Sequence, residues 1–122
     1  MEDPEGGIAL AMKRVEGTSW LDLLHPTSQV GKLVAKRFTV ERHLEILLDV
    51  CDAVAFAHSR GIIHCDLKPS NVMVGEHGEV LLMDWGIARS IEEFPDAAFN
   101  RAEGASSSVS GTPQYMAPEQ AQ

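Results

Sequence analysis

The stretch from residue 40 to residue 60 constrains the fold more than any other part of the sequence. Thr39 can cap the start of a helix there, and Gly61 can end it. Between them, apolar residues recur at spacings of three and four, as on the buried face of an amphipathic helix. The stripe consists of Leu44, Leu47, Leu48, Cys51, Val54, Ala55 and His58. We therefore expect one long helix whose stripe packs against the rest of the chain.

Two short apolar runs follow this helix, at residues 71–74 and 80–83. The four residues between them begin and end with glycine, which predicts a turn and therefore a β-hairpin. Residues 90–110 have no clear hydrophobic period and include a cluster of serines at 106–110. A stretch of this length and pattern is typical of a mobile functional loop.

The N-terminal part of the chain predicts smaller elements. Residues 8–12 form an apolar run that is typical of a buried strand. Ser19, with Asp22 three residues later, predicts the start of a short helix that ends before Pro26. Residues 25–38 are mixed and polar, and we interpret them as a connector.

Composition excludes several classes of protein. With 122 residues, 44% of them hydrophobic, the chain can bury a core and is too apolar for a disordered segment. A net charge of −8 and the lack of a basic stripe argue against nucleic acid as a partner. We find no membrane segment and no signal peptide. Two cysteines in unrelated contexts predict free thiols and a cytoplasmic location.

The most specific feature is the octapeptide His-Cys-Asp-Leu-Lys-Pro-Ser-Asn at residues 64–71. Asp-Trp-Gly follows at 84–86, Gly-Thr-Pro at 111–113 and Ala-Pro-Glu at 117–119. In this order and spacing, the motifs resemble those of the serine/threonine protein kinase family, of the bacterial eukaryotic-like type. The resemblance covers nearly the whole chain and implies an α+β, protein-kinase-like fold.

The resemblance implies transfer of a phosphoryl group from ATP, with Mg²⁺, to a Ser or Thr hydroxyl of a protein substrate. It assigns catalytic roles to Asp66, Lys68, Asn71 and Thr112. The residue types suit this chemistry: a carboxylate at Asp66 can accept the hydroxyl proton, and the Lys68 ammonium can neutralise phosphate charge. Asn71 and Asp84 offer the hard oxygen atoms that Mg²⁺ requires. Asp84 and Lys68 also contact the nucleotide in this reading.

The same resemblance divides the chain. Residues 1–17 match the end of the N-terminal lobe and the hinge, 18–83 match the C-lobe helices and the catalytic-loop hairpin, and 84–119 match the activation segment. The chain is thus expected to be a fragment that runs from the hinge strand through the catalytic loop to the activation segment. The residues implied to surround the adenine ring are Met12, Lys13, Val15 and Met73, for which core packing is the alternative interpretation.

The sequence departs from the family pattern at two positions and by omission. Cys65 stands where the family has an arginine that pairs with a phosphorylated activation-loop residue, and a thiol cannot form that pair. Trp85 replaces a phenylalanine, and its large ring can still pack beside His64. No Gly-rich phosphate loop and no strand lysine precede the hinge.

Two functions therefore remain open at the level of sequence. One is a kinase, with these residues inactive on their own because the phosphate-binding elements are missing. The other is a non-catalytic binding or regulatory module of kinase shape. The intact set Asp66, Lys68, Asn71 and Asp84 favours the first, and the missing elements favour the second. A Gly-rich loop and a strand lysine encoded upstream in frame would decide for the kinase.

Overall fold

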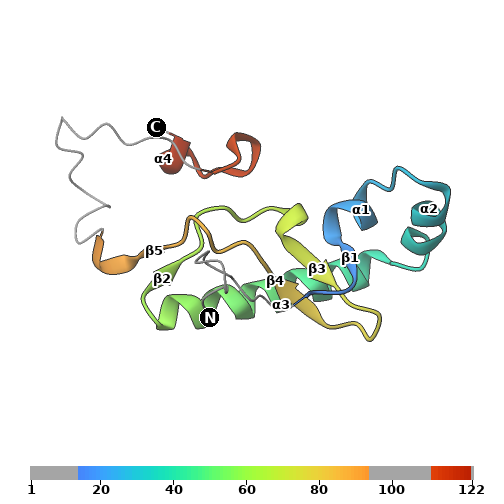
Figure 1. The fold of residues 1–122 in the computed structure, drawn as a ribbon, viewed down its shortest axis with the longest axis horizontal. Helices are drawn as coiled ribbons and strands as arrows, with labels where there is room; N and C mark the ends of the chain where they lie inside the picture. The colour runs from blue at the N-terminus through green and yellow to red at the C-terminus, as the bar shows by residue number, and fades with distance from the viewer. Residues whose placement is uncertain (1–13, 94–110, 122) are drawn as a thin grey trace, which may run out of the picture.

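The computed structural model describes residues 14–93 and 111–121 (Figure 1). The helices are α1 (Trp20–Leu24), α2 (Gln29–Ala35), α3 (Val40–Ser59) and α4 (Pro118–Ala121). The strands are β1 (Thr18–Ser19), β2 (Ile62–Ile63), β3 (Val72–Val74), β4 (Val80–Leu82) and β5 (Arg89–Ser90). Short 3₁₀ turns are η1 (Pro69–Asn71), η2 (Ile91–Glu93) and η3 (Pro113–Tyr115). The predicted strand at 8–12 and the serines at 106–110 lie outside the described residues.

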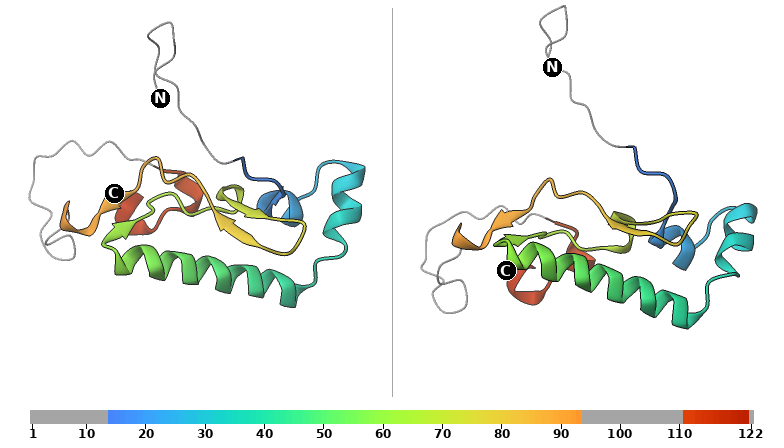
Figure 2. Two further views of the ribbon diagram at one scale, coloured as in Figure 1. Left: turned by 60° about the horizontal axis from the view of Figure 1, so that its bottom comes forward. Right: turned by 90° about the horizontal axis from the view of Figure 1, so that it is seen from below.

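The long helix α3 confirms the prediction for residues 40–60. Its cap is Thr39, whose hydroxyl accepts a hydrogen bond from the Arg42 backbone N–H at 3.2 Å. Gly61 follows the helix with a φ of 73°, a left-handed conformation that glycine adopts without steric cost. Figure 2 shows α3 running along one side of the molecule, with the strands lying over it.

The predicted hairpin is also present. β3 and β4 pair antiparallel, with Val72 opposite Leu82, and the turn between them closes where the Gly75 N–H donates to the Glu79 carbonyl at 2.8 Å. β1 adds to the other edge of β3 and completes a three-stranded sheet. Just before β1, Gly17 has a φ of 145°, and a Cβ there would come within 2.5 Å of the Val74 carbonyl oxygen. Only glycine therefore allows the chain to enter the sheet this closely.

The core lies between this sheet, α1 and one face of α3. Its buried members are Leu23, Ile46, Val50, Val72 and Val74. Burial of these side chains, at about 25 cal/mol per Å² of apolar surface, holds the hairpin against the helix. Loop 64–71 leads into β3, and residues 84–86 follow β4 closely. The buried hairpin therefore also fixes where these two segments lie.

The predicted buried stripe of α3 is largely wrong. Ile46, Val50 and Ala57 are the buried residues of this helix, whereas Leu44, Leu47 and Leu48 are 55%, 44% and 65% exposed. Cys51, Ala55 and His58 are exposed as well, and only Val54 is half-buried. The reason is that α3 carries two adjacent apolar faces, and the hairpin covers the one that contains Ile46. The other face lines an open apolar groove of about 530 Å³.

The connector predicted at 25–38 contains a helix that the sequence interpretation missed. α2 begins after Ser28, whose hydroxyl accepts a hydrogen bond from the Gly31 N–H at 2.9 Å. The helix has only seven residues, too few for a clear apolar period, and its Val30 and Leu33 are 71% and 65% exposed. α2 packs against α1. Over the described ranges, none of the helices combines the length and apolar character that a bilayer crossing needs.

Candidate active site

The loop that joins β2 to β3 is organised around His64, which is 2% exposed. Its Nδ1 accepts a hydrogen bond from the Asp66 N–H at 3.1 Å, so the ring proton must lie on Nε2. Nε2 faces the Met83 carbonyl oxygen at 2.8 Å and donates to it. His64 thereby joins the loop to the end of β4. The Trp85 ring meets it edge-on at 4.5 Å between centroids, which confirms the predicted contact.

Asp66 lies at the centre of a hydrogen-bonded group. Its Oδ1 accepts from the backbone N–H of Thr112 at 3.1 Å and from the Thr112 hydroxyl at 3.0 Å. Its Oδ2 lies 3.4 Å from the ammonium of Lys68. The Asn71 amide donates to the Asp66 carbonyl oxygen at 2.9 Å. Residues far apart in sequence therefore converge on this carboxylate.

These contacts set the charge of Asp66. Partial desolvation raises the pKa of its carboxyl, but hydrogen bonds from Thr112, Lys68 and Asn71 and the Lys68 charge together outweigh it. The pKa therefore lies below its ordinary value. Asp66 is ionised at neutral pH and can act as a hydrogen-bond acceptor for an incoming hydroxyl.

Lys68 and Thr112 contact each other directly. The Lys68 ammonium donates to the Thr112 hydroxyl at 2.6 Å. The three side chains of Asp66, Lys68 and Thr112 form a closed triangle, in which each bonds to the other two. The predicted catalytic residues Asp66, Lys68, Asn71 and Thr112 are thus brought together by direct contacts.

Asp84 lies at the end of the hairpin nearest to this group. The preceding residue, Met83, donates its N–H to the Asn71 carbonyl at 2.7 Å, which fixes the start of the segment beside η1. Asp84 itself has a φ of 57° and an exposed side chain, whose Oδ1 accepts weakly from the Gly86 N–H at 3.4 Å. A shared site for Mg²⁺ between Asn71 and Asp84 stays a prediction.

Only some of the residues implied to surround the adenine ring lie within the described part of the chain. Met12 and Lys13 lie outside the described residues. Val15 is half-buried in a segment without regular structure, and Met73 is half-buried in β3, opposite Ser19 and Leu81. Their contact with a nucleotide stays a prediction.

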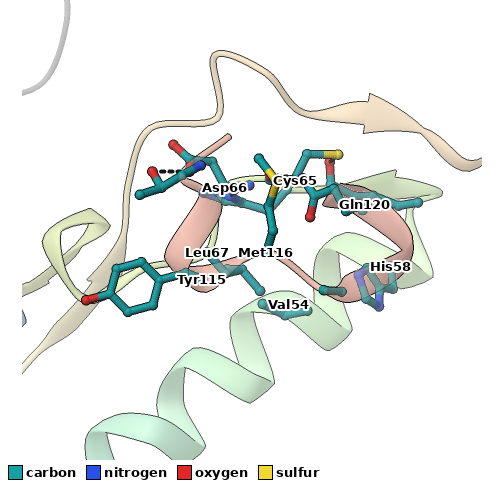
Figure 3. A pocket seen from close by; sticks show the side chains of 12 residues that line it. Val54, His58, Cys65, Asp66, Leu67, Tyr115, Met116 and Gln120 are labelled. Carbon is teal, nitrogen blue, oxygen red and sulfur yellow. Dashed lines mark hydrogen bonds between the residues drawn. The ribbon is translucent and has the colours of Figure 1, made fainter. Parts of the chain in front are cut away.

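A pocket opens beside Asp66 on the side of residues 111–120 (Figure 3). It has a volume of about 260 Å³ and is lined mainly by apolar side chains from α3, loop 64–67 and the segment at 112–120. Val54, Leu67, Tyr115 and Met116 contribute to its walls. Figure 3 also shows Gln120 beside Cys65, a contact that the sequence interpretation missed because a glutamine after Ala-Pro-Glu carries no local signal.

Comparison with known proteins identifies the class. The family model of the protein kinase domain matches residues 2–122, and the chain belongs to the protein kinase family. It is similar to the serine/threonine-protein kinase PknB of Mycolicibacterium smegmatis, with 35% identity over 121 residues, covering 98% of this chain and 17% of the relative.

Other relatives are likewise named serine/threonine-protein kinases. PknB of Mycobacterium tuberculosis is 36% identical over 98% of this chain. PknD of Protochlamydia amoebophila is 40% identical over 88 residues, which cover 64% of this chain and 9% of the relative. The chain spans 17% of the length of the PknB relatives and so represents a small part of proteins of that size. The chain is thus a member of the serine/threonine protein kinase family with an α+β fold.

Proposed function

We propose that these residues form the catalytic floor of an enzyme that transfers the terminal phosphoryl group of ATP to Ser or Thr hydroxyls of protein substrates. The observation that carries this proposal is the closed triangle of Asp66, Lys68 and Thr112. It holds an ionised carboxylate and a cation side by side, as in-line transfer to a hydroxyl requires.

Each side chain has a separate task. Asp66 orients the substrate hydroxyl and accepts its proton. Lys68 neutralises charge on the transferring phosphoryl group. Thr112 fixes both by donating to one and accepting from the other. The activation segment, which contains Thr112, therefore has to be docked before the carboxylate and the ammonium take up these positions.

Mg²⁺, when bound with ATP, neutralises phosphate charge. The donor chemistry at the hairpin suits it, since Asn71 commits its amide nitrogen to Asp66 and leaves its carbonyl oxygen to coordinate. Asp84 adds an exposed carboxylate that makes one long hydrogen bond within its own loop. We assign Asn71 and Asp84 as the ligands, and Met12, Lys13, Val15 and Met73 as the adenine contacts. With free cysteines, a cytoplasmic location suits this function.

The 122 residues contain no Gly-rich loop and no strand lysine, so on their own they lack the groups that hold the phosphates from above. We infer that this chain alone transfers phosphate at an undetectable rate, because positioning supplies several kcal/mol of barrier reduction. The second candidate function is a non-catalytic binding or regulatory module, and those missing elements favour it.

A domain swap tests both candidates. Residues 2–122 replace the matching segment of the M. smegmatis PknB kinase domain, and phosphate transfer from radiolabelled ATP to a Ser/Thr-containing protein is measured. We expect transfer by the swapped domain that Asp66→Asn abolishes, and none by the isolated chain. The matched control is Asp52→Asn, because Asp52 is an exposed carboxylate on α3.

Two results would contradict these proposals. Robust, Asp66-dependent transfer by the isolated chain would refute the need for the missing elements. A swapped domain that is folded by circular dichroism and yet inactive would favour the binding module.

A further inference from the structure

The residue before Asp66 has an unusual backbone. Cys65 has a φ of 69°, in the left-handed region that residues other than Gly, Asn and Asp seldom occupy. A cysteine gains nothing from this conformation by itself, so neighbouring groups must hold it there. Its own thiol contributes little, since it donates to the Ile63 carbonyl oxygen at 3.6 Å and an S–H group is a weak donor.

The peptide unit that joins Cys65 to Asp66 is held at both ends. Its N–H, which belongs to Asp66, donates to His64 Nδ1 at 3.1 Å. Its carbonyl oxygen, which belongs to Cys65, accepts from Gln120 Nε2 at 2.6 Å. Because a peptide unit is planar, two hydrogen bonds on opposite edges fix its orientation and with it the direction of the Asp66 side chain.

Gln120 reaches this carbonyl from α4, 55 residues further along the chain. Gly111 closes the site from a second side, because a Cβ at that position would lie 3.1 Å from the Cys65 oxygen and 3.3 Å from Gln120 Nε2. Gly111 directly precedes Thr112, which bonds to the Asp66 carboxylate. The segment 111–120 therefore grips Asp66 twice, once at its side chain and once at its backbone.

We propose that Gln120 is a positioning residue, which holds the left-handed Cys65 backbone so that the Asp66 carboxylate faces Thr112 and Lys68. This role rests on the proposed function, since it matters for phosphate transfer only if Asp66 is the acceptor of the hydroxyl proton. It makes the docking of α4 a condition for a correctly aimed Asp66. When α4 leaves, the Cys65–Asp66 peptide loses the bond to Gln120 and retains the bond to His64.

The first test measures how firmly the backbone at Cys65 is held, in an assay that requires no catalysis. In the chain with Cys51→Ser, Cys65 is the only thiol, and its alkylation by iodoacetamide is compared with the rate in concentrated urea. We expect Cys65 to be alkylated more slowly in the folded chain than in urea. Gln120→Ala should speed this alkylation about tenfold, the factor that corresponds to the free energy of one hydrogen bond. Gln114→Ala is the control, since Gln114 is exposed in the same segment.

An unprotected Cys65 in the Cys51→Ser chain, or an alkylation rate that Gln120→Ala leaves unchanged, would overturn the proposal. Because alkylation requires no phosphate transfer, this result is independent of whether the swapped domain is a kinase.

The second test uses kinetics of the swapped domain. Gln120→Ala should lower kcat about tenfold and change KM for ATP less than about twofold, because Gln120 is not among the residues assigned to the nucleotide. Adding Cys65→Gly should recover most of the lost kcat, since glycine takes up a positive φ without cost. An unchanged kcat in Gln120→Ala, or a loss that Cys65→Gly does not repair, would refute positioning through the backbone. Inactivity of every swapped domain, including the one without substitutions, would refute the proposed function. The alkylation experiment alone would then decide whether Gln120 holds the Cys65 backbone.

Discussion

Replacing Thr112 by valine tests the central triangle with a change of almost no volume. The substitution removes the hydroxyl that donates to Asp66 at 3.0 Å and accepts from Lys68 at 2.6 Å. It leaves the backbone N–H of residue 112 bonded to Asp66. The loss is therefore confined to two hydrogen bonds that involve charged groups.

The expected size of the effect follows from these contacts. A hydrogen bond to a charged group contributes about 1.5–3 kcal/mol when buried. The side chains of Asp66 and Lys68 are 12% and 23% exposed, so water replaces part of the loss, and they still lie 3.4 Å apart. We therefore expect about 2 kcal/mol in total, which corresponds to a roughly 30-fold lower kcat.

The assay is kcat of the swapped domain with Thr112→Val and, as its matched control, Thr112→Ser. Serine keeps the hydroxyl and should stay within about threefold of the unsubstituted domain. The acid limb of the pH–rate profile should also shift to higher pH in Thr112→Val, because a hydrogen bond that lowers the pKa of Asp66 is lost. Full activity of Thr112→Val, or an equal loss in Thr112→Ser, would refute the reasoning.

Three further outcomes are expected. Because the folded pKa of Asp66 is lowered, its charge stabilises the fold above the unfolded pKa of about 4 and ceases to do so as the pH falls through the folded pKa. Urea unfolding of Asp66→Asn should therefore depend less on pH below about 5, and an unaltered pH dependence would contradict this. Trp85→Phe keeps a ring against His64 and loses only the indole hydrogen bond to the Leu82 carbonyl, so it should cost about 1 kcal/mol of unfolding free energy, and Trp85→Ala clearly more. Alanine substitution of the serines at 106–110 should leave the activity of the swapped domain nearly unchanged unless Cys65→Arg is also present, because a thiol cannot grip phosphate; a large loss from the alanines alone would show that another cation does so.

Local signals explain which parts of the fold could be predicted. Thr39 and Gly61 marked the ends of α3, because caps and stops act within one helical turn. The paired apolar runs and the glycines between them predicted the hairpin of β3 and β4. Ser19 predicted the start of α1, and its hydroxyl does accept from the Asp22 N–H.

The errors arise where the outcome depends on partners distant in sequence. α3 has two apolar faces, and only the position of the hairpin decides that Ile46 is buried and Leu48 is not. The contact between Gln120 and the Cys65 carbonyl oxygen spans 55 residues of sequence, so no local pattern could predict it. The left-handed backbone of Cys65 could not be foreseen either, since cysteine has no intrinsic preference for it.

The exposed face of α3 also has a consequence for how sequences of this kind diverge. If water covers Leu44, Leu47 and Leu48 throughout the life of the protein, replacing them by polar residues costs almost nothing, and mutation should introduce such residues freely. If the face is covered for most of that time, the same positions should stay apolar as consistently as Ile46 and Val50. The frequency of polar replacements at these two sets of positions among related genes would therefore show whether this face is mostly covered or mostly in water.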